Sequence, residues 1–241
     1  MIYVMSDLHG QYNAFLKMLE LINFTDEDEL YILGDIIDRG PNPLEIYDYI
    51  KDKPNIHMLM GNHELMMNDF YDEKPRAWWN SKSDDYRLWM RNGGKITEDA
   101  INARPEKEQK EIKEFFKSLE YYKLIEVSDE KFILSHARPN IYGVAPLEDE
   151  LAYNVKDTSI VWNREISSRR MKNGYRAIHG HTPVQYAFGM DRIVAYSYGE
   201  VIDIDCGCAG AYSLACLRLD DMKQFYIDDL DPVPNSSDDE E

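Results

Sequence analysis

The chain has 241 residues, and 44% of them are hydrophobic, so it can bury a sizeable core as one large domain or two small ones. Its formal net charge of -18 repels a phosphate backbone and excludes non-specific nucleic-acid binding. No apolar run approaches the ~18 residues of a membrane span, and residues 1–5 are too short for a signal peptide. We therefore expect no membrane partner and a cytoplasmic location.

Short apolar runs alternate with helical patterns over the first 64 residues. Strands are expected at residues 2–5, 30–33 and 56–60, and amphipathic helices at about 15–22 and 44–50. This alternation of strand and helix implies right-handed crossovers between parallel strands, which indicates an α/β core.

Polar residues follow each of these three strands directly. They are Asp7 and His9, then Asp35, Asp38 and Arg39, then Asn62 and His63. Because open parallel sheets place ligand sites at the carboxyl ends of their strands, we expect these side chains to converge. The second group favours a phosphoryl-transfer centre, in which a carboxylate bridges two cations and a guanidinium binds phosphate. It also fits an acidic turn that its own arginine neutralises, and the group alone leaves both interpretations open.

The rest of the chain divides into a helical part, a strand-rich part and a tail. Residues from about 65 to 122 are expected to form a helical insert, which either caps the site or merely covers the sheet. From residue 124 onward, short strand patterns suggest a second sheet packed on the first. These expected strands span residues 124–127, 131–134, 177–178, 192–195, 201–204, 214–217 and 225–227.

We expect a single domain over residues 1–227. Residues 228–241 carry seven acidic and no basic side chains, together with two prolines and two serines. Such a segment buries too little apolar surface to order itself, so it is expected to be a disordered tail.

Most of the histidines lie at the expected strand ends or beside glycine. They are His9, His63, His136 and the pair His179 and His181. One histidine alone is more often structural than a metal ligand, but this placement favours ligands. Mixed imidazole and carboxylate ligands suit Mn, Fe, Zn or Ni better than Ca or Mg. The three cysteines, at 206, 208 and 216, lie in one apolar segment and are expected to be buried, reduced thiols.

Three motifs resemble the phosphoesterase signatures of the calcineurin-like metallophosphoesterases. They are Ser-Asp-Leu-His-Gly at 6–10, Gly-Asp-Ile-Ile-Asp-Arg-Gly at 34–40 and Gly-Asn-His-Glu at 61–64. Within that superfamily the chain is most similar to the phosphoprotein phosphatase family, in particular to bacterial and lambda-phage-type serine/threonine protein phosphatases. Further support comes from residues 92–94, 161–165, 180–183 and 202–207, so the resemblance runs from about residue 2 to 220. It implies two mixed β-sheets packed as a sandwich and flanked by helices.

The resemblance also implies a site with two divalent metal ions. Its ligands would be Asp7, His9, Asp35, Asn62, His136 and His181, with Asp35 bridging both ions. The two ions are expected to be manganese, with Fe, Zn or Ni as alternatives. A hydroxide shared between them would attack phosphorus in line. Arg39, Arg164 and Asn62 would bind the phosphate oxygens. His63 would protonate the leaving oxygen, and Asp38 would orient His63 and keep its imidazole protonated to higher pH.

Three positions depart from the family pattern or leave a choice open. His179 lies two residues before His181, so either could be the ligand, and the Gly-His-Thr-Pro match favours His181. Arg138 stands where the family usually has glycine, and it would either bind substrate phosphate or, as we favour, pair with a local acid. Cys206 replaces the usual threonine, which we expect to be a packing change.

The expected activity is that of a metal-dependent phosphomonoesterase acting on phosphoserine or phosphothreonine in proteins, with a phosphorylated protein or peptide as its partner. The alternative is a hydrolase of dinucleoside polyphosphates, since symmetrical diadenosine tetraphosphatases share these motifs. An inactive metal-binding scaffold is disfavoured, because Asp38, Arg39, His63 and Arg164 are all present. A monomer is expected.

Overall fold

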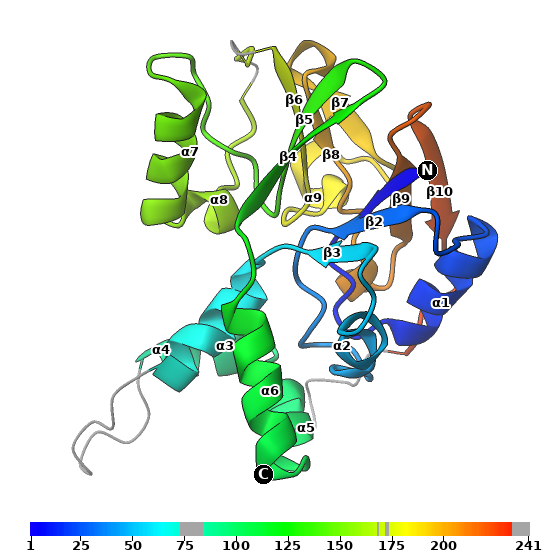
Figure 1. Ribbon diagram of the computed structural model, residues 1–241, viewed down its shortest axis with the longest axis vertical. Coiled ribbons are helices and arrows are strands. Elements are labelled where there is room, and N and C mark those ends of the chain that lie inside the picture. The colour runs from blue at the N-terminus through cyan, green and yellow to red at the C-terminus, as the bar shows by residue number, and fades with distance from the viewer. Residues whose placement is uncertain (73–83, 168, 172–173, 233–241) are drawn as a thin grey trace.

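The computed structural model describes residues 1–72, 84–167, 169–171 and 174–232. At its centre lie two five-stranded sheets (Figure 1). In sheet order, the first contains β10 (Lys223–Ile227), β9 (Leu214–Arg218), β1 (Ile2–Met5), β2 (Glu29–Ile32) and β3 (Ile56–Met58). The second contains β4 (Tyr122–Val127), β5 (Glu130–Ser135), β6 (Tyr175–His179), β8 (Val201–Asp203) and β7 (Val194–Tyr196).

Both sheets combine three parallel strands with antiparallel neighbours. In the first sheet β1, β2 and β3 run parallel, β9 pairs antiparallel with β1, and β10 pairs antiparallel with β9. In the second sheet β5, β6 and β8 run parallel, and β4 and β7 flank them in the opposite direction. The prediction of two mixed sheets is thus confirmed, and each sheet brings the carboxyl ends of three parallel strands to one edge.

Alternating side chains on the strands create the layers. On β1, Val4 faces the second sheet and packs with a cluster that includes Phe132 and Ile178, so this cluster fills the sandwich interior. Tyr3 and Met5 point the other way, into a second cluster beneath the helices. On β5, Ile133 likewise turns outward toward the helix layer of the second sheet. The expected α/β sandwich flanked by helices therefore follows directly from the two-residue period of the strands.

The flanking helices are α1 (Tyr12–Leu21), α2 (Glu45–Ile50), α3 (Asn62–Asp72), α4 (Asp84–Arg91), α5 (Lys95–Asn102), α6 (Glu106–Lys117), α7 (Leu147–Lys156), α8 (Ser159–Trp162) and α9 (Val184–Phe188). Figure 1 shows α3 to α6 gathered at one end of the first sheet, and α7 and α8 beside the second. The expected helical insert corresponds to α3 to α6, although α3 begins at Asn62, so two candidate site residues open the helix. Residues 73–83 of the insert lie outside the described residues. None of the helices described combines the length and apolar character that crossing a membrane requires.

The ordered domain extends past residue 227, where the disordered acidic tail was expected to begin. Residues 228–232 lie against the domain, because Asp231 exchanges hydrogen bonds with the fully buried Gln11: its backbone N–H donates to Gln11 Oε1 at 2.6 Å and its carbonyl accepts from Gln11 Nε2 at 3.1 Å. The Asp231 carboxylate also accepts from the backbone N–H of Asn13, in the first turn of α1. Leu230 packs against the core. Polar contacts, rather than apolar burial alone, thus dock this short segment; residues 233–241 lie outside the described residues.

These contacts lead to a prediction about truncation. A chain ending at Ile227 should be less stable than one ending at Pro232 by about 1–3 kcal/mol, because it loses both hydrogen bonds to Gln11 and the packing of Leu230. Urea unfolding of the two truncated chains measures the difference. Equal midpoints and slopes would mean that residues 228–232 contribute nothing to the fold.

Candidate active site

The loops that leave the parallel strands are bonded to one another through their backbones. The N–H groups of Asp7, His9 and Gly10 donate to the carbonyls of Gly34, Asp35 and Ile36 at 3.2, 2.9 and 2.8 Å. The loop after β1 is therefore fixed to the loop after β2. This pairing brings together side chains that are about 28 residues apart in sequence.

A cavity of about 210 Å³ lies where the two sheets' strand ends meet. It is lined by Asp7, His9, Asp35, Arg39, Asn62, Arg164, His181, Pro183, Tyr186, Asp205, Gly207 and Ala209. Seven of the predicted site residues are in this lining, and the other three, Asp38, His63 and His136, are fully buried beside it. A larger cavity of about 660 Å³ lies between α3 and α6 and contains none of these residues.

Backbone carbonyls orient two of the histidine rings. Nδ1 of His9 lies 2.9 Å from the carbonyl of Ile37, and Nδ1 of His136 lies 2.8 Å from the carbonyl of Leu33. A carbonyl oxygen can only accept a hydrogen bond, so the Nδ1 that faces it must carry the proton of the ring. The lone pair of Nε2 is then turned toward the site. Fixing one ring nitrogen in this way is how proteins prepare a histidine to bind a metal.

Nε2 of His136, which carries no hydrogen, then faces the acceptor oxygens of Asn62 and Asp35. Nε2 of His136 lies 2.9 Å from Asn62 Oδ1, 3.1 Å from His181 Nδ1 and 3.5 Å from Asp35 Oδ2. Nε2 of His181 is buried and has no hydrogen-bond partner. Converging lone pairs and an unsatisfied buried nitrogen are costly without a cation, so the donor set fits a bound metal.

The carboxylates in the cavity repel one another. Burial and the neighbouring Asp7 raise the pKa of Asp35 well above its usual range. The pKa of Asp205 is raised by burial and by both Asp7 and Asp35. Divalent cations would relieve this repulsion. Asp205 is not among the site residues that the sequence predicts, although an acidic residue just after a strand is the same signal that singles out Asp7.

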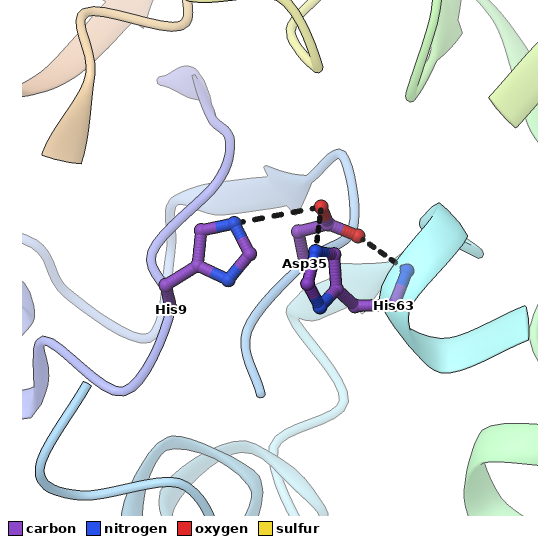
Figure 2. Close-up of side chains that lie close together, drawn as sticks. All are labelled: His9, Asp35 and His63. Carbon is purple, nitrogen blue, oxygen red and sulfur yellow. Dashed lines mark hydrogen bonds and ion pairs between the residues drawn. The ribbon is translucent and has the colours of Figure 1, made fainter. Parts of the chain in front are cut away.

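Asp35 occupies the centre of the acidic cluster. Ligand atoms of His9, Asp35 and His63 lie within 4.8 Å of one another, and so do those of Asp7, Asp35 and His136. Figure 2 shows both imidazoles of the first group directed at the Asp35 carboxylate, with Oδ2 3.5 Å from His9 Nε2 and 3.8 Å from His63 Nε2. Asp35 is the residue common to both groups, which is the position a bridging ligand needs.

The residues present therefore fit two divalent metal ions. Asp7, His9, Asp35, Asn62, His136 and His181 would hold them. When bound, such ions polarise phosphoryl oxygens and lower the pKa of water to near neutrality. In the present arrangement the nearest cation to the imidazoles is the Arg39 guanidinium, whose Nη1 lies 3.2 Å from His9 Nε2.

His63 is bonded on both sides of its ring. Its Nδ1 lies 2.6 Å from Asp38 Oδ2, and its Nε2 lies 2.8 Å from Arg39 Nη2. A guanidinium can only donate, so Nε2 accepts here and the imidazole is neutral. Burial, followed by the charge of Arg39, lowers the pKa of His63 well below its usual value. The expectation that Asp38 keeps this imidazole protonated to higher pH is therefore wrong for this arrangement, because burial and Arg39 outweigh the carboxylate.

Two arginines supply the positive side of the cavity. Arg164 is held by weak hydrogen bonds from Nη1 to the carbonyl of His181 and to Thr182 Oγ1, at 3.3 and 3.4 Å. Together with Arg39 it leaves guanidinium donors facing the cavity, which can bind two oxygens of one phosphate.

The backbone of the site is strained. Six candidate residues have positive φ angles, between 42° and 72°: Asp7, His9, Asp35, Asp38, Arg39 and His181. Non-glycine residues rarely adopt this left-handed region, and they cluster in it at functional sites. The neighbouring Gly61 is needed for a different reason, since a β-carbon there would overlap Asp35 Oδ1.

Glu64 organises the loops around Asp35, a role that sequence reasoning missed. Its carboxylate accepts the backbone N–H groups of Asp35, Ile36 and Gly61 at 2.8, 3.0 and 3.1 Å. Burial and the charge of Asp35 raise its pKa to about 8. A glutamate in the first turn of a helix is a recognisable signal, because its carboxylate can accept N–H groups near the helix start.

The structure distinguishes the two neighbouring histidines. His181 lines the cavity, whereas Nε2 of His179 is 2.8 Å from the hydroxyl of Tyr196 and points away from it. Arg138 meets neither expectation. It is buried over the Tyr196 ring, does not line the cavity, and forms no ion pair with any acidic side chain in the described residues. Cys206 is buried in a small cluster with Val184 and Ala215, and all three cysteines are free thiols.

Comparison with known proteins identifies the family. Residues 1–206 match the family model described as calcineurin-like phosphoesterase. The chain belongs to this family of metal-dependent phosphoesterases. The alignment with serine/threonine-protein phosphatase 2 of Salmonella typhimurium shows 29% identity over 219 residues, covering 88% of this chain and 90% of that protein.

Relatives of a different activity also align. A symmetrical bis(5'-nucleosyl)-tetraphosphatase of Wigglesworthia glossinidia brevipalpis is 46% identical, but only over 65 residues, which are 26% of this chain and 24% of that protein. The solved structure of a candidate diadenosine tetraphosphatase superposes with a TM-score of 0.64 at 12% identity, covering 96% of this chain and 93% of the other. That likeness supports the shared fold and does not bear on the substrate.

The position of Asp35 leads to a prediction about metals. Removal of metal with a chelator should abolish activity and Mn should restore it, whereas Asp35→Asn should stay nearly inactive and retain less metal, because one bridging charge is lost. Metal analysis of each purified protein, with the exposed Asp26→Asn as matched control, measures the effect. Two ions per chain at unchanged affinity in Asp35→Asn would contradict the bridging role.

Proposed function

We propose that this phosphoesterase is a serine/threonine protein phosphatase that uses two manganese ions. The observation that carries the proposal is the alignment with serine/threonine-protein phosphatase 2, which extends over nearly the whole of both chains. The tetraphosphatase alignment covers only about a quarter of each. A match that includes the insert and the second sheet bears on the whole molecule, rather than on the three metal-binding loops alone.

The shape of the cavity supports the same proposal. Its volume of about 210 Å³ and its lining of carboxylates, imidazoles and guanidinium groups suit one phosphate group, with the rest of the substrate outside. A phosphorylated side chain on a protein surface needs no deeper pocket. Mixed imidazole, amide and carboxylate donors suit Mn, Fe, Zn or Ni, and manganese is the metal proposed here.

The chemistry assigned to the chain's own residues follows from their positions. Arg39 and Arg164 bind the oxygens of the phosphate. When the phosphate draws Arg39 away from His63, Nε2 is free to carry a proton and to donate it to the departing serine or threonine oxygen. Asp38 stabilises the charged ring through Nδ1, at 2.6 Å.

A dinucleoside tetraphosphatase is the second candidate, and one feature favours it. Tyr186 lies on the rim of the cavity and is 77% exposed. An exposed aromatic ring beside a phosphate site can stack on a nucleobase. The local alignment with the tetraphosphatases is in keeping with this reading.

The two candidates predict different substrate preferences. A phosphoserine peptide should be cleaved with a kcat/KM at least ~10-fold above that for diadenosine tetraphosphate, and Tyr186→Ala should change neither value by more than about 2-fold. Tyr198→Ala serves as the control, since that tyrosine is 74% exposed and absent from the cavity lining. A preference for the dinucleotide that falls selectively in Tyr186→Ala would instead establish the second candidate.

The role of His63 predicts a dependence on the leaving group. His63→Asn should lower the rate on a phosphoserine peptide by ~10²–10⁴, the usual contribution of a general acid, and should lower it far less on p-nitrophenyl phosphate. The nitrophenolate needs little protonation as it departs. Both rates are measured at saturating Mn, so that lost metal is not mistaken for lost acid catalysis. Equal losses would mean that His63 binds phosphate or orients the nucleophile.

A further inference from the structure

The Asp38 carboxylate is bound by two side chains of the helical insert. Trp89 Nε1, on α4, donates to Asp38 Oδ2 at 2.9 Å. Thr97 Oγ1, on α5, donates to Asp38 Oδ1 and accepts the backbone N–H of Asp38 at 3.0 Å. Asp38, Trp89 and Thr97 are all completely buried.

These bonds fix the carboxylate in one orientation. Thr97 holds Oδ1, so rotation of the group would break that bond and move Oδ2 away from both Trp89 and His63. Oδ2 is shared between the indole N–H and Nδ1 of His63, which makes the four side chains one connected network. Burial raises the pKa of Asp38 to about 7, and the bonds from Thr97 and Trp89 oppose that rise, which favours the ionised form that accepts from His63.

The insert is built so that Trp89 reaches this position. Its indole ring packs against Phe70 of α3 at 5.5 Å between ring centroids and against Tyr71 at 5.9 Å. A β-carbon at Gly94 would overlap the indole, so glycine is required where the turn passes the ring. The Trp89 side chain is thus held by the insert independently of Asp38.

The same turn also holds the phosphate-binding arginine. The backbone N–H of Arg39 donates to the carbonyl of Gly93 at 3.3 Å, and Nε of Arg39 donates weakly to the carbonyl of Asn92 at 3.4 Å. Apart from Asn62, which opens α3, no described residue of α3 to α6 lines the catalytic cavity. Residues 84–102 of the insert therefore contact the site from behind, through Asp38 and Arg39, and do not act as a cap.

We propose that Trp89 and Thr97 are positioning residues for catalysis: they hold the Asp38 carboxylate so that it fixes the His63 ring in line with the leaving oxygen. The inference rests on the proposed proton transfer from His63. It is independent of whether the phosphate is carried by a protein or by a nucleotide, because it concerns only the protonation of the leaving group.

The test compares two small substrates that differ only in their leaving group, phenyl phosphate and p-nitrophenyl phosphate. Trp89→Phe removes one hydrogen-bond donor to Asp38, and Thr97→Val removes one donor together with the acceptor of the Asp38 backbone N–H; both keep most of the buried volume. Each should lower kcat on phenyl phosphate by ~10–100-fold, the usual effect of losing an orienting group behind a catalytic residue, with KM nearly unchanged. The loss on p-nitrophenyl phosphate should stay within about 3-fold, since its leaving group needs little protonation.

Matched variants separate positioning from loss of stability. Thr97→Ser keeps the hydroxyl and should restore activity on phenyl phosphate to near the native rate. Thr25→Val removes a similar bond, from Thr25 Oγ1 to Asp28 at 2.9 Å in a loop outside the site, and should leave the ratio of the two rates unchanged. Metal content and thermal unfolding are measured for every variant, so that a misfolded protein is recognised.

Three outcomes would overturn these claims. Equal losses on both substrates in Thr97→Val and Trp89→Phe, with the expected unequal losses in His63→Asn, would refute positioning by the insert. Equal losses in His63→Asn itself would refute the proposed proton donor, and with it the basis of this inference. Failure of Thr97→Ser to recover activity would also refute positioning by the insert. The Thr97 hydroxyl would then not be the group that holds Asp38 for catalysis.

Discussion

Buried negative charge is the constraint on which the rest of the structure depends. Asp7, Asp35 and Asp205 share one small cavity, and only two guanidinium groups, of Arg39 and Arg164, face it from the described lining. Burial, together with their mutual repulsion, raises the pKa values of Asp35 and Asp205. A fold that keeps these carboxylates together must fix each of them by hydrogen bonds within a rigid backbone. It must also leave room for cations that neutralise them.

Two parts of the protein divide that task. The parallel strands of both sheets bring the ligands to one edge, and backbone bonds between the β1 and β2 loops set their spacing. The insert and the first turn of α3 supply orientation: Glu64 gathers three N–H groups around Asp35, while Trp89 and Thr97 bind Asp38. Most of the candidate ligands thus follow strand ends, with Asn62 at the start of α3, and Glu64, Trp89 and Thr97 orient the loops from the helices.

How far the sequence could predict this arrangement depends on the range of the interactions involved. The strands and the convergence of their polar ends follow from local patterns and from the geometry of parallel sheets, and both were predictable. Helix α7 was missed, although Pro146 followed by an acidic first turn is a helix-start signal. The burial of Arg138 and the docking of Asp231 on Gln11 depend on contacts between distant segments, about which a sequence pattern carries no information. The lowering of the His63 pKa depends on the burial of its ring and on the position of Arg39, which are likewise tertiary properties.

The left-handed backbone of the site has a consequence for the stability of the fold. Each non-glycine residue held at positive φ costs about 1–2 kcal/mol, and six such residues lie among repelling carboxylates. Ions that bind only the folded chain offset this cost; at a free concentration 100 times the dissociation constant they add about 2.7 kcal/mol of stability. Without them, the loops around Asp7 and Asp35 keep their strain and their repelling charges without compensation, and the folded state is less stable. Metal supply would then act on the folding equilibrium as well as on catalysis.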